Sequence, residues 1–218
     1  MRLAWGLLAG LICPLAAPAL DPPSPVPALA QMQRRFDGLA DLSARFERTF
    51  QWKLAGKKQT FKGKLILKKP DKFRFEADGQ VVSTDGQSVW NYTPATRQVV
   101  IRRYAPPEKD RTPEGLLFNL LFRGTSAQDY VARDAGAARR DGKACRLVDL
   151  TARQEGAYIA AVRLWVETGT ALPIRVEYTD FNGDVTTYRL WELNPYRKMA
   201  DDAFRFTPPA GVEVVDLR

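Results

Sequence analysis

The sequence predicts a mainly β fold of the α+β type, with one continuous, strongly curved antiparallel sheet of about eleven strands and helices on its concave side. Apolar and charged residues alternate with a period of two along most of the chain, most clearly between Gly63 and Phe75. The turn signals that separate these segments follow one another too closely for parallel crossovers, which favours antiparallel neighbours. One apolar segment with helical spacing precedes the strands, and a second one interrupts them.

The first helix is expected over Ala28 to Leu39, where apolar residues recur every three or four positions. From Leu42 the spacing shortens to two, and Leu42, Ala44, Phe46, Arg48 and Phe50 share one phase of a long strand. Further strands are expected over Gln59–Lys69, Lys72–Ala77, Gln80–Thr84, Ser88–Tyr92 and Gln98–Arg103.

A second helix is expected after this meander. Thr112 is a suitable N-cap, Pro113 suits the first helical position, and Glu114 places a negative charge in the first turn. Six of the seven residues in Leu116–Phe122 are apolar, so this short helix is apolar on nearly every side.

Strands then resume, with hairpin turns at Asp141-Gly142 and Asn182-Gly183. A short helix is expected near Asp201–Ala203, before Phe204-Arg205-Phe206 and the final run Val212 to Val215. The expected strands are Asp129–Arg133, Ala144–Leu150, Tyr158–Glu167, Leu172–Thr179 and Asp184–Leu193.

Residues 1–19 resemble a cleavable export signal, with Arg2 at the start, an apolar stretch from Leu3 to Leu15, and a small-x-small site ending at Ala19. Residues 20–218 are then expected to form a single domain. Ile12 before Cys13 argues against lipid attachment at that cysteine. Cleavage would leave Cys145 as the one cysteine, which excludes a disulfide framework and suggests a small core residue.

The composition argues against catalysis and cofactors. The chain has no histidine, and so lacks the commonest general base and imidazole metal ligand. One mature cysteine cannot build a thiolate metal cluster, and no nucleophile elbow, phosphate loop or dinucleotide fingerprint is present. The formal net charge of +8 falls to +7 without Arg2. Because the charges are scattered and the protein is expected to be exported, we expect no nucleic-acid partner.

Three motifs carry a resemblance to a known family. They are the run Gly63 to Phe75 with its Lys69-Pro70 corner, the hairpin Asp85-Gly86-x-x-Val89-Trp90-x-Tyr92, and the ending Phe204 to Val212. In order and at matching spacing, these motifs resemble the periplasmic outer-membrane lipoprotein carrier protein LolA family, over most of the chain from about Ala28. The resemblance implies an incomplete antiparallel β-barrel with a helical lid over an apolar cavity.

The resemblance also implies partners and site residues. A monomer would bind acylated lipoproteins released by the inner-membrane Lol ABC transporter and deliver them to the outer-membrane acceptor LolB or an equivalent. Lys69, where the family commonly has arginine, would help to hold the closed state, although lysine lacks the bidentate fork. The helix provides the candidate lid residues Leu116, Leu117, Phe118, Leu120 and Leu121. The candidate lipid-binding residues are Phe46, Leu65, Leu67, Phe73, Phe75, Trp90 and Tyr92.

Other interpretations stay open from the residues alone. The aromatic residues and the apolar helix are also what an ordinary filled core requires. On the same half-barrel, a stress-sensing interaction module similar to RseB, a membrane-tethered acceptor like LolB, or a carrier of another lipid are alternatives.

Overall fold

The computed structural model describes residues 26–104, 113–123, 129–195 and 198–218. The expected export signal at residues 1–19 and the Thr112 cap lie outside this range. None of the helices in the described ranges has the length and apolar content to span a bilayer.

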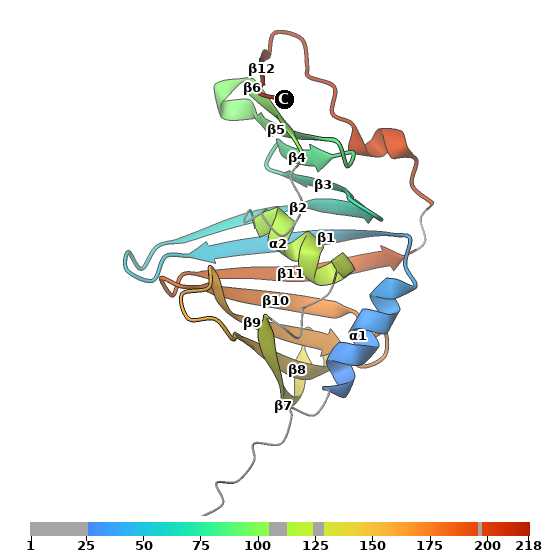
Figure 1. Cartoon of the computed structure of the whole chain (residues 1–218), viewed down its shortest axis with the longest axis vertical. Helices are drawn as coiled ribbons and strands as arrows, with labels where there is room; N and C mark the ends of the chain where they lie inside the picture. Colours follow the sequence, from blue (N-terminus) through green and yellow to red (C-terminus); the bar gives the residue numbers. More distant parts are fainter. Residues whose placement is uncertain (1–25, 105–112, 124–128, 196–197) are drawn as a thin grey trace, which may run out of the picture.

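The dominant element is one sheet of twelve strands, in the order β12-β6-β5-β4-β3-β2-β1-β11-β10-β9-β8-β7 (Figure 1). All neighbouring strands run antiparallel except β12 and β6, which are parallel. The strands are β1 Asp41–Gln51, β2 Lys58–Lys68, β3 Lys72–Ala77, β4 Gln80–Thr84, β5 Ser88–Thr93, β6 Gln98–Arg103, β7 Tyr130–Arg140, β8 Lys143–Ala152, β9 Ile159–Glu167, β10 Pro173–Asp180, β11 Val185–Pro195 and β12 Glu213–Asp216.

The sheet curves strongly and does not close on itself. Its two edges are β12 and β7. This confirms the predicted mainly β fold and the incomplete barrel. Two details differ from the expectation. The final run of the chain adds a twelfth, parallel strand, and β7 extends to Arg140 because it pairs with β8 up to the Asp141-Gly142 turn.

Two helical segments cover the concave side of the sheet (Figure 1). Helix α1 (Pro27–Asp37) starts with proline, which suits a first helical turn, and buries Met32 and Phe36 completely. Helix α2 (Pro113–Phe118) continues as the π-helical turn η3 (Asn119–Arg123), so the expected second helix is present with a wider final turn. Two 3₁₀ turns complete the helical content of the described ranges: η1 Pro94–Thr96 and η4 Asp201–Phe204.

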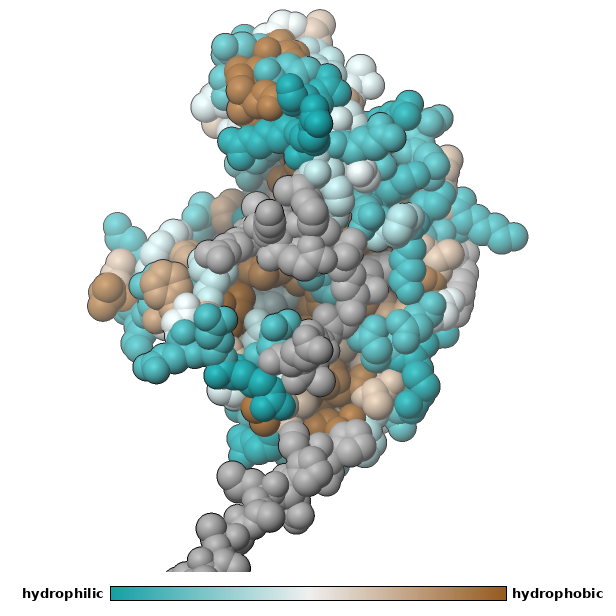
Figure 2. Space-filling view, in the orientation of Figure 1, coloured by the Kyte–Doolittle hydropathy of each residue, from teal (hydrophilic) through white to brown (hydrophobic). Residues whose placement is uncertain are grey.

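The main core lies between these helices and the concave face. One continuous cluster joins side chains of α1, α2 and η3 to apolar residues of the central and distal strands. Figure 2 shows apolar surface in the recessed middle of the same face. The helices therefore supply the second layer that a one-sided apolar sheet requires.

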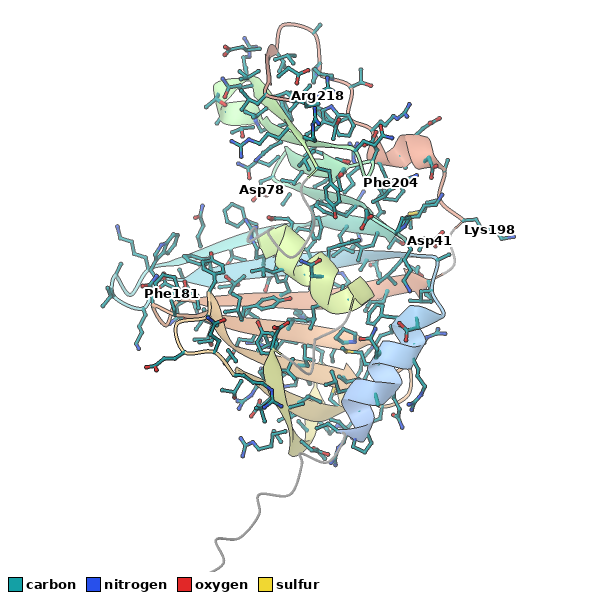
Figure 3. All side chains as sticks on the ribbon, viewed as in Figure 1. Asp41, Asp78, Phe181, Lys198, Phe204 and Arg218 are labelled. Atoms are coloured by element: carbon teal, nitrogen blue, oxygen red, sulfur yellow. The ribbon has the colours of Figure 1, made fainter. Side chains whose placement is uncertain are left out.

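A smaller apolar cluster lies on the opposite face of β3 to β6, under the C-terminal segment. Phe204 is fully buried there, and its carbonyl accepts a hydrogen bond of 2.6 Å from the Ser83 hydroxyl. Asp201 pairs with Lys68 and Lys72, and its hydrogen bonds to these two lysines lower the pKa of its carboxyl to about 2. Figure 3 shows Phe204 beside β3 and β4, where the chain crosses toward β12.

Cys145 lies in the core with 1% of its surface exposed, as the sequence predicts. Burial raises the pKa of its thiol. The side chain therefore behaves as a small apolar residue.

Gly63 lies at a point of β2 where there is no room for a side chain. A Cβ atom at this position would lie 1.9 Å from the Glu76 carbonyl oxygen and 2.9 Å from the ring of Phe46. The backbone of β3 and the inward ring of β1 thus both require the absence of a side chain here.

We expect Gly63→Ala to lower the free energy of unfolding by about 2–4 kcal/mol, because the new methyl group collides with backbone that cannot move alone. Chemical denaturation of both proteins measures the difference. Gly169→Ala is the control, since no atom lies within 4 Å of a Cβ at that position. Equal stability of the two variants would show that position 63 has room for a side chain.

Candidate functional site

Cross-strand pairing decides which side chains share the concave face, because directly opposed residues of antiparallel strands point to the same side. Leu65 opposes Phe75, and Leu67 opposes Phe73. Phe46 opposes Gly63 on the same face. All five of these apolar side chains are buried, with at most 3% of their surface exposed. The structure therefore brings together five of the seven candidate lipid-binding residues.

The aromatic members of this group form a continuous row. The ring centroids are 5.9 Å apart for Phe46 and Phe75, and 5.6 Å apart for Phe75 and Phe73. Phe118 of α2 extends the row, at 5.3 Å from Phe73. Edge-to-face and tilted contacts at these distances are favourable beyond the burial of area alone.

The candidate lid residues cover this row. Leu117, Phe118 and Leu121 are completely buried, and Leu120 is nearly so. Leu116 is half-buried at the edge of the cluster. The segment expected as a lid thus lies across the concave face, with almost every apolar side chain directed into the core.

Trp90 and Tyr92 lie elsewhere, and the expectation that they share this face is wrong. Phe73 and Phe75 oppose Thr84 and Val82 on β4, whereas Trp90 opposes Ser83 and Tyr92 opposes Val81. Their side chains therefore point to the convex side. Tyr92 stacks on Phe206 there, with ring centroids 5.3 Å apart. Tyr92 thus contacts the C-terminal segment, and both aromatic residues drop out of the candidate lipid-binding group.

Little free space remains between α2 and the sheet. A small cavity of about 50 Å³ lies at the ends of β10 and β11, lined by Leu116, Tyr158 and Tyr178 among others. A volume of this size suits a few water molecules rather than a fatty acyl chain. A larger groove of about 530 Å³ lies on the convex side and is lined mainly by charged and polar residues. The described lid side chains therefore occupy the surface where the sequence predicts the hollow.

Lys69 directly follows β2, and its side chain reaches the C-terminal end of helix α1. Its ammonium group donates hydrogen bonds to the carbonyl oxygens of Phe36, at 2.7 Å, and Asp37, at 3.2 Å. A cation at this position also interacts favourably with the helix dipole. The predicted latch residue therefore contacts α1, the other covering helix.

A second contact between cover and sheet was not predicted. Arg48 of β1 forms an ion pair with Glu114 of α2, and both side chains are more than four-fifths buried. Burial favours the neutral form of Arg48, but the Glu114 carboxylate outweighs this effect and the pKa of Arg48 is raised. A signal was present in the sequence, because Arg48 interrupts the apolar phase of its strand between Phe46 and Phe50.

The concave face offers no constellation for catalysis in the described residues, which also contain no group of three or more potential metal ligands. The face offers apolar contact to whatever lies on it. Two helices cover it, and Lys69 and the Arg48–Glu114 ion pair attach these helices to the sheet. These features define a protein of the open half-barrel type with a covered apolar face suited to binding.

Comparison with known sequences agrees with this class. The family model described as "Outer membrane lipoprotein carrier protein LolA" matches residues 37–207, and the chain belongs to that family. An outer-membrane lipoprotein carrier protein of Dechloromonas aromatica is 27% identical, with 86% of this chain and 87% of the relative covered. One from Xanthomonas axonopodis pv. citri is 28% identical, with 82% and 83% covered. The family is one of carriers, which confirms that the chain is not an enzyme.

Among solved structures, an uncharacterized conserved protein from Thermus thermophilus is similar with a TM-score of 0.56. It is 16% identical, and the match covers 87% of this chain and 96% of that one. This similarity supports the fold.

We expect Lys69→Met to loosen α1, since two helix carbonyls lose a charged hydrogen-bond donor worth about 1–2 kcal/mol. Hydrogen exchange measured by mass spectrometry should show faster exchange in α1 and little change in β7 to β9. Lys64→Met is the control, because Lys64 is an exposed lysine of the neighbouring strand β2. Unchanged protection of α1 would argue against the latch.

Proposed function

We propose that this protein is a periplasmic carrier that encloses the acyl chains of lipoproteins between its concave face and its helical cover. Residues 1–19 would direct export and be removed. The cargo would come from the inner-membrane Lol ABC transporter and go to the outer-membrane acceptor LolB or an equivalent. Membership of the LolA family supports the cargo class, since its relatives carry the name of lipoprotein carriers.

The structural observation that best supports the proposal is the apolar nature of the contact between cover and sheet. Leu117, Phe118 and Leu121 belong to the same apolar cluster as Phe73 and its neighbours, and Phe118 contacts Phe73 directly. A saturated acyl chain can make the same contacts as these lid side chains, because hydrophobic attraction is not directional. The lid side chains therefore occupy the same surface of the sheet that we propose for the acyl chains.

The energy of such an exchange is close to balanced. Each fully buried Leu or Phe side chain contributes about 1.5–3 kcal/mol, so the four buried lid residues contribute on the order of 10 kcal/mol. A palmitoyl chain, at about 0.8 kcal/mol for each buried methylene, gains a similar amount. This balance holds for one chain; full burial of all three chains of a triacylated anchor would gain about three times as much, so we infer that cargo which can be released is only partly buried.

The direct test uses a synthetic triacylated cysteinyl peptide with a fluorophore and the mature protein. We expect a one-to-one complex by native mass spectrometry, and a deacylated version of the peptide should not bind. Equal behaviour of the two peptides would overturn the proposed function.

Leu116→Glu provides the matching variant. Leu116 is half-buried at the small cavity, next to Asp180 and Asp184, so a new carboxylate places a third negative charge at the entrance. We expect affinity for the triacylated peptide to fall roughly tenfold, or about 1.4 kcal/mol, while the melting temperature changes little. Val131→Glu, on the convex side of β7, is the control and should bind as the wild type does. Equal affinities would exclude this end of the sheet as the entrance.

A further inference from the structure

Among the described residues, the largely apolar concave face carries a group of polar side chains from three neighbouring strands. Arg48 lies on β1 and opposes Tyr188 on β11. Tyr188 in turn opposes Val176 on β10, two residues before Tyr178. The two tyrosine rings contact each other edge to face, with centroids 6.5 Å apart. We call Arg48, Tyr178 and Tyr188 the interior polar group.

Both tyrosine hydroxyls are buried; the Tyr178 hydroxyl makes no hydrogen bond to a described residue, and the Tyr188 hydroxyl has only the neighbouring Arg48 guanidinium. Tyr188 is completely inaccessible, and Tyr178 is 4% exposed. The Arg48 guanidinium is close enough to the Tyr188 hydroxyl to act on its pKa, but it is directed at Glu114. A buried hydroxyl normally finds a partner, because leaving it unsatisfied costs free energy. The ring of Tyr178 contacts that of Tyr188, so this part of the concave face has hydrogen-bonding capacity that the described residues do not use.

Arg48 is held in position from two sides. Its guanidinium lies over the ring of Phe61, 4.9 Å from the centroid, and its ion pair with Glu114 comes from the covering helix. Glu114 supplies the negative charge that faces this group, and it belongs to α2 and not to the sheet. When α2 moves away, the carboxylate leaves with it and the guanidinium stays on the concave face.

The group that remains is rich in donors. Burial raises the pKa of both tyrosines well above the ordinary value, so their hydroxyls keep their protons. A guanidinium has donors only, and each hydroxyl has one donor to offer. Covering these donors with hydrocarbon alone would leave a buried charge uncompensated, which is strongly unfavourable. The occupant must therefore bring oxygen acceptors as well as chains.

The interior polar group borders both the apolar row and the small cavity. The ring of Tyr188 is 5.9 Å from that of Phe46, which belongs to the row. Tyr178 lines the cavity beside Leu116. A ligand with oxygens at the root of long chains can thus place its oxygens here while the chains follow the row toward Phe75 and Phe73.

We propose that Arg48, Tyr178 and Tyr188 form a subsite for the carbonyl oxygens at the root of the acyl chains, with Glu114 as the group that the ligand displaces. This inference rests on the proposed function and adds to it a polar determinant inside the cover. The ester carbonyls of an acylated glyceryl group and the carboxylate of a free fatty acid share the acceptor chemistry that the subsite recognises.

The experiment compares two fluorescent triacylated peptides that differ only in the links to the glyceryl group. One carries ester links, and the other carries ether links that keep the chain length but lack those carbonyl oxygens. We expect the wild type to bind the ester form about tenfold more tightly. In the double variant Tyr178→Phe/Tyr188→Phe, which removes two hydroxyls and no apolar surface, this preference should fall to within about twofold. Tyr92→Phe, the same change on the convex side, should keep it.

Two further variants separate anchoring from latching. Arg48→Met should lose the ester preference. Glu114→Gln should keep that preference and take up the ester probe faster, because the cover is held less tightly. Palmitate competition identifies the source of the oxygens: strong displacement of the ester probe by palmitate, lost in Arg48→Met, assigns the subsite to a free carboxylate, and weak displacement assigns it to esters.

The outcomes distinguish this inference from the function on which it rests. A wild type that binds ester and ether probes equally, or a double tyrosine variant with an unchanged preference, overturns the subsite and leaves the carrier function intact. A wild type that binds neither probe overturns the carrier function and the subsite together.

Discussion

The contact between the concave face and its two covering helices is the interaction on which the rest of the structure depends. An open sheet with one apolar face has no stable form in water unless something shields that face. Here α1, α2 and η3 provide the shield, and their side chains complete a single core with the central strands. The same surface that stabilises the closed protein is the surface that we propose for cargo.

This double use explains why the attachment of the cover is polar while its contact area is apolar. Apolar contact holds the helices near the sheet but does not fix where they lie, because it has little directional preference. Lys69 at the end of α1 and the Arg48–Glu114 pair on α2 add direction at two separate points. Polar attachments of this kind can be broken and re-formed without dismantling the sheet.

Much of the fold could be predicted from the sequence, because strand alternation and turn residues are local signals. The two phases of each strand were also clear, but local alternation does not say which phase points inward. In β2 and β3 one phase consists mainly of charged residues, which indicates that the other phase points inward. For β5 both phases contain apolar residues, and the large aromatic ones, Trp90 and Tyr92, point to the convex side, where Phe204 and Phe206 meet the sheet from far along the chain. Partners that distant leave no periodic signal at β5.

The candidate site divides along the same lines. The aromatic row and the covering helix follow from apolar patterns and were predicted. Arg48 was visible as a charged residue in an apolar phase, yet its meaning depends on Glu114 and on two tyrosines of β10 and β11, which only the folded sheet brings to it. Lys69 could be singled out as a basic residue at a strand corner, but its contact with α1 depends on how the first helix packs against the sheet.

The burial of Cys145 has a practical consequence for watching this protein at work. It is the sole thiol in the described part of the chain, and its low exposure and raised pKa make it unreactive toward maleimide reagents. A single cysteine introduced on an exposed position of α1 or of the sheet can then carry a spin label or dye against a silent background. Distances between two such labels would report the opening of the cover in real time.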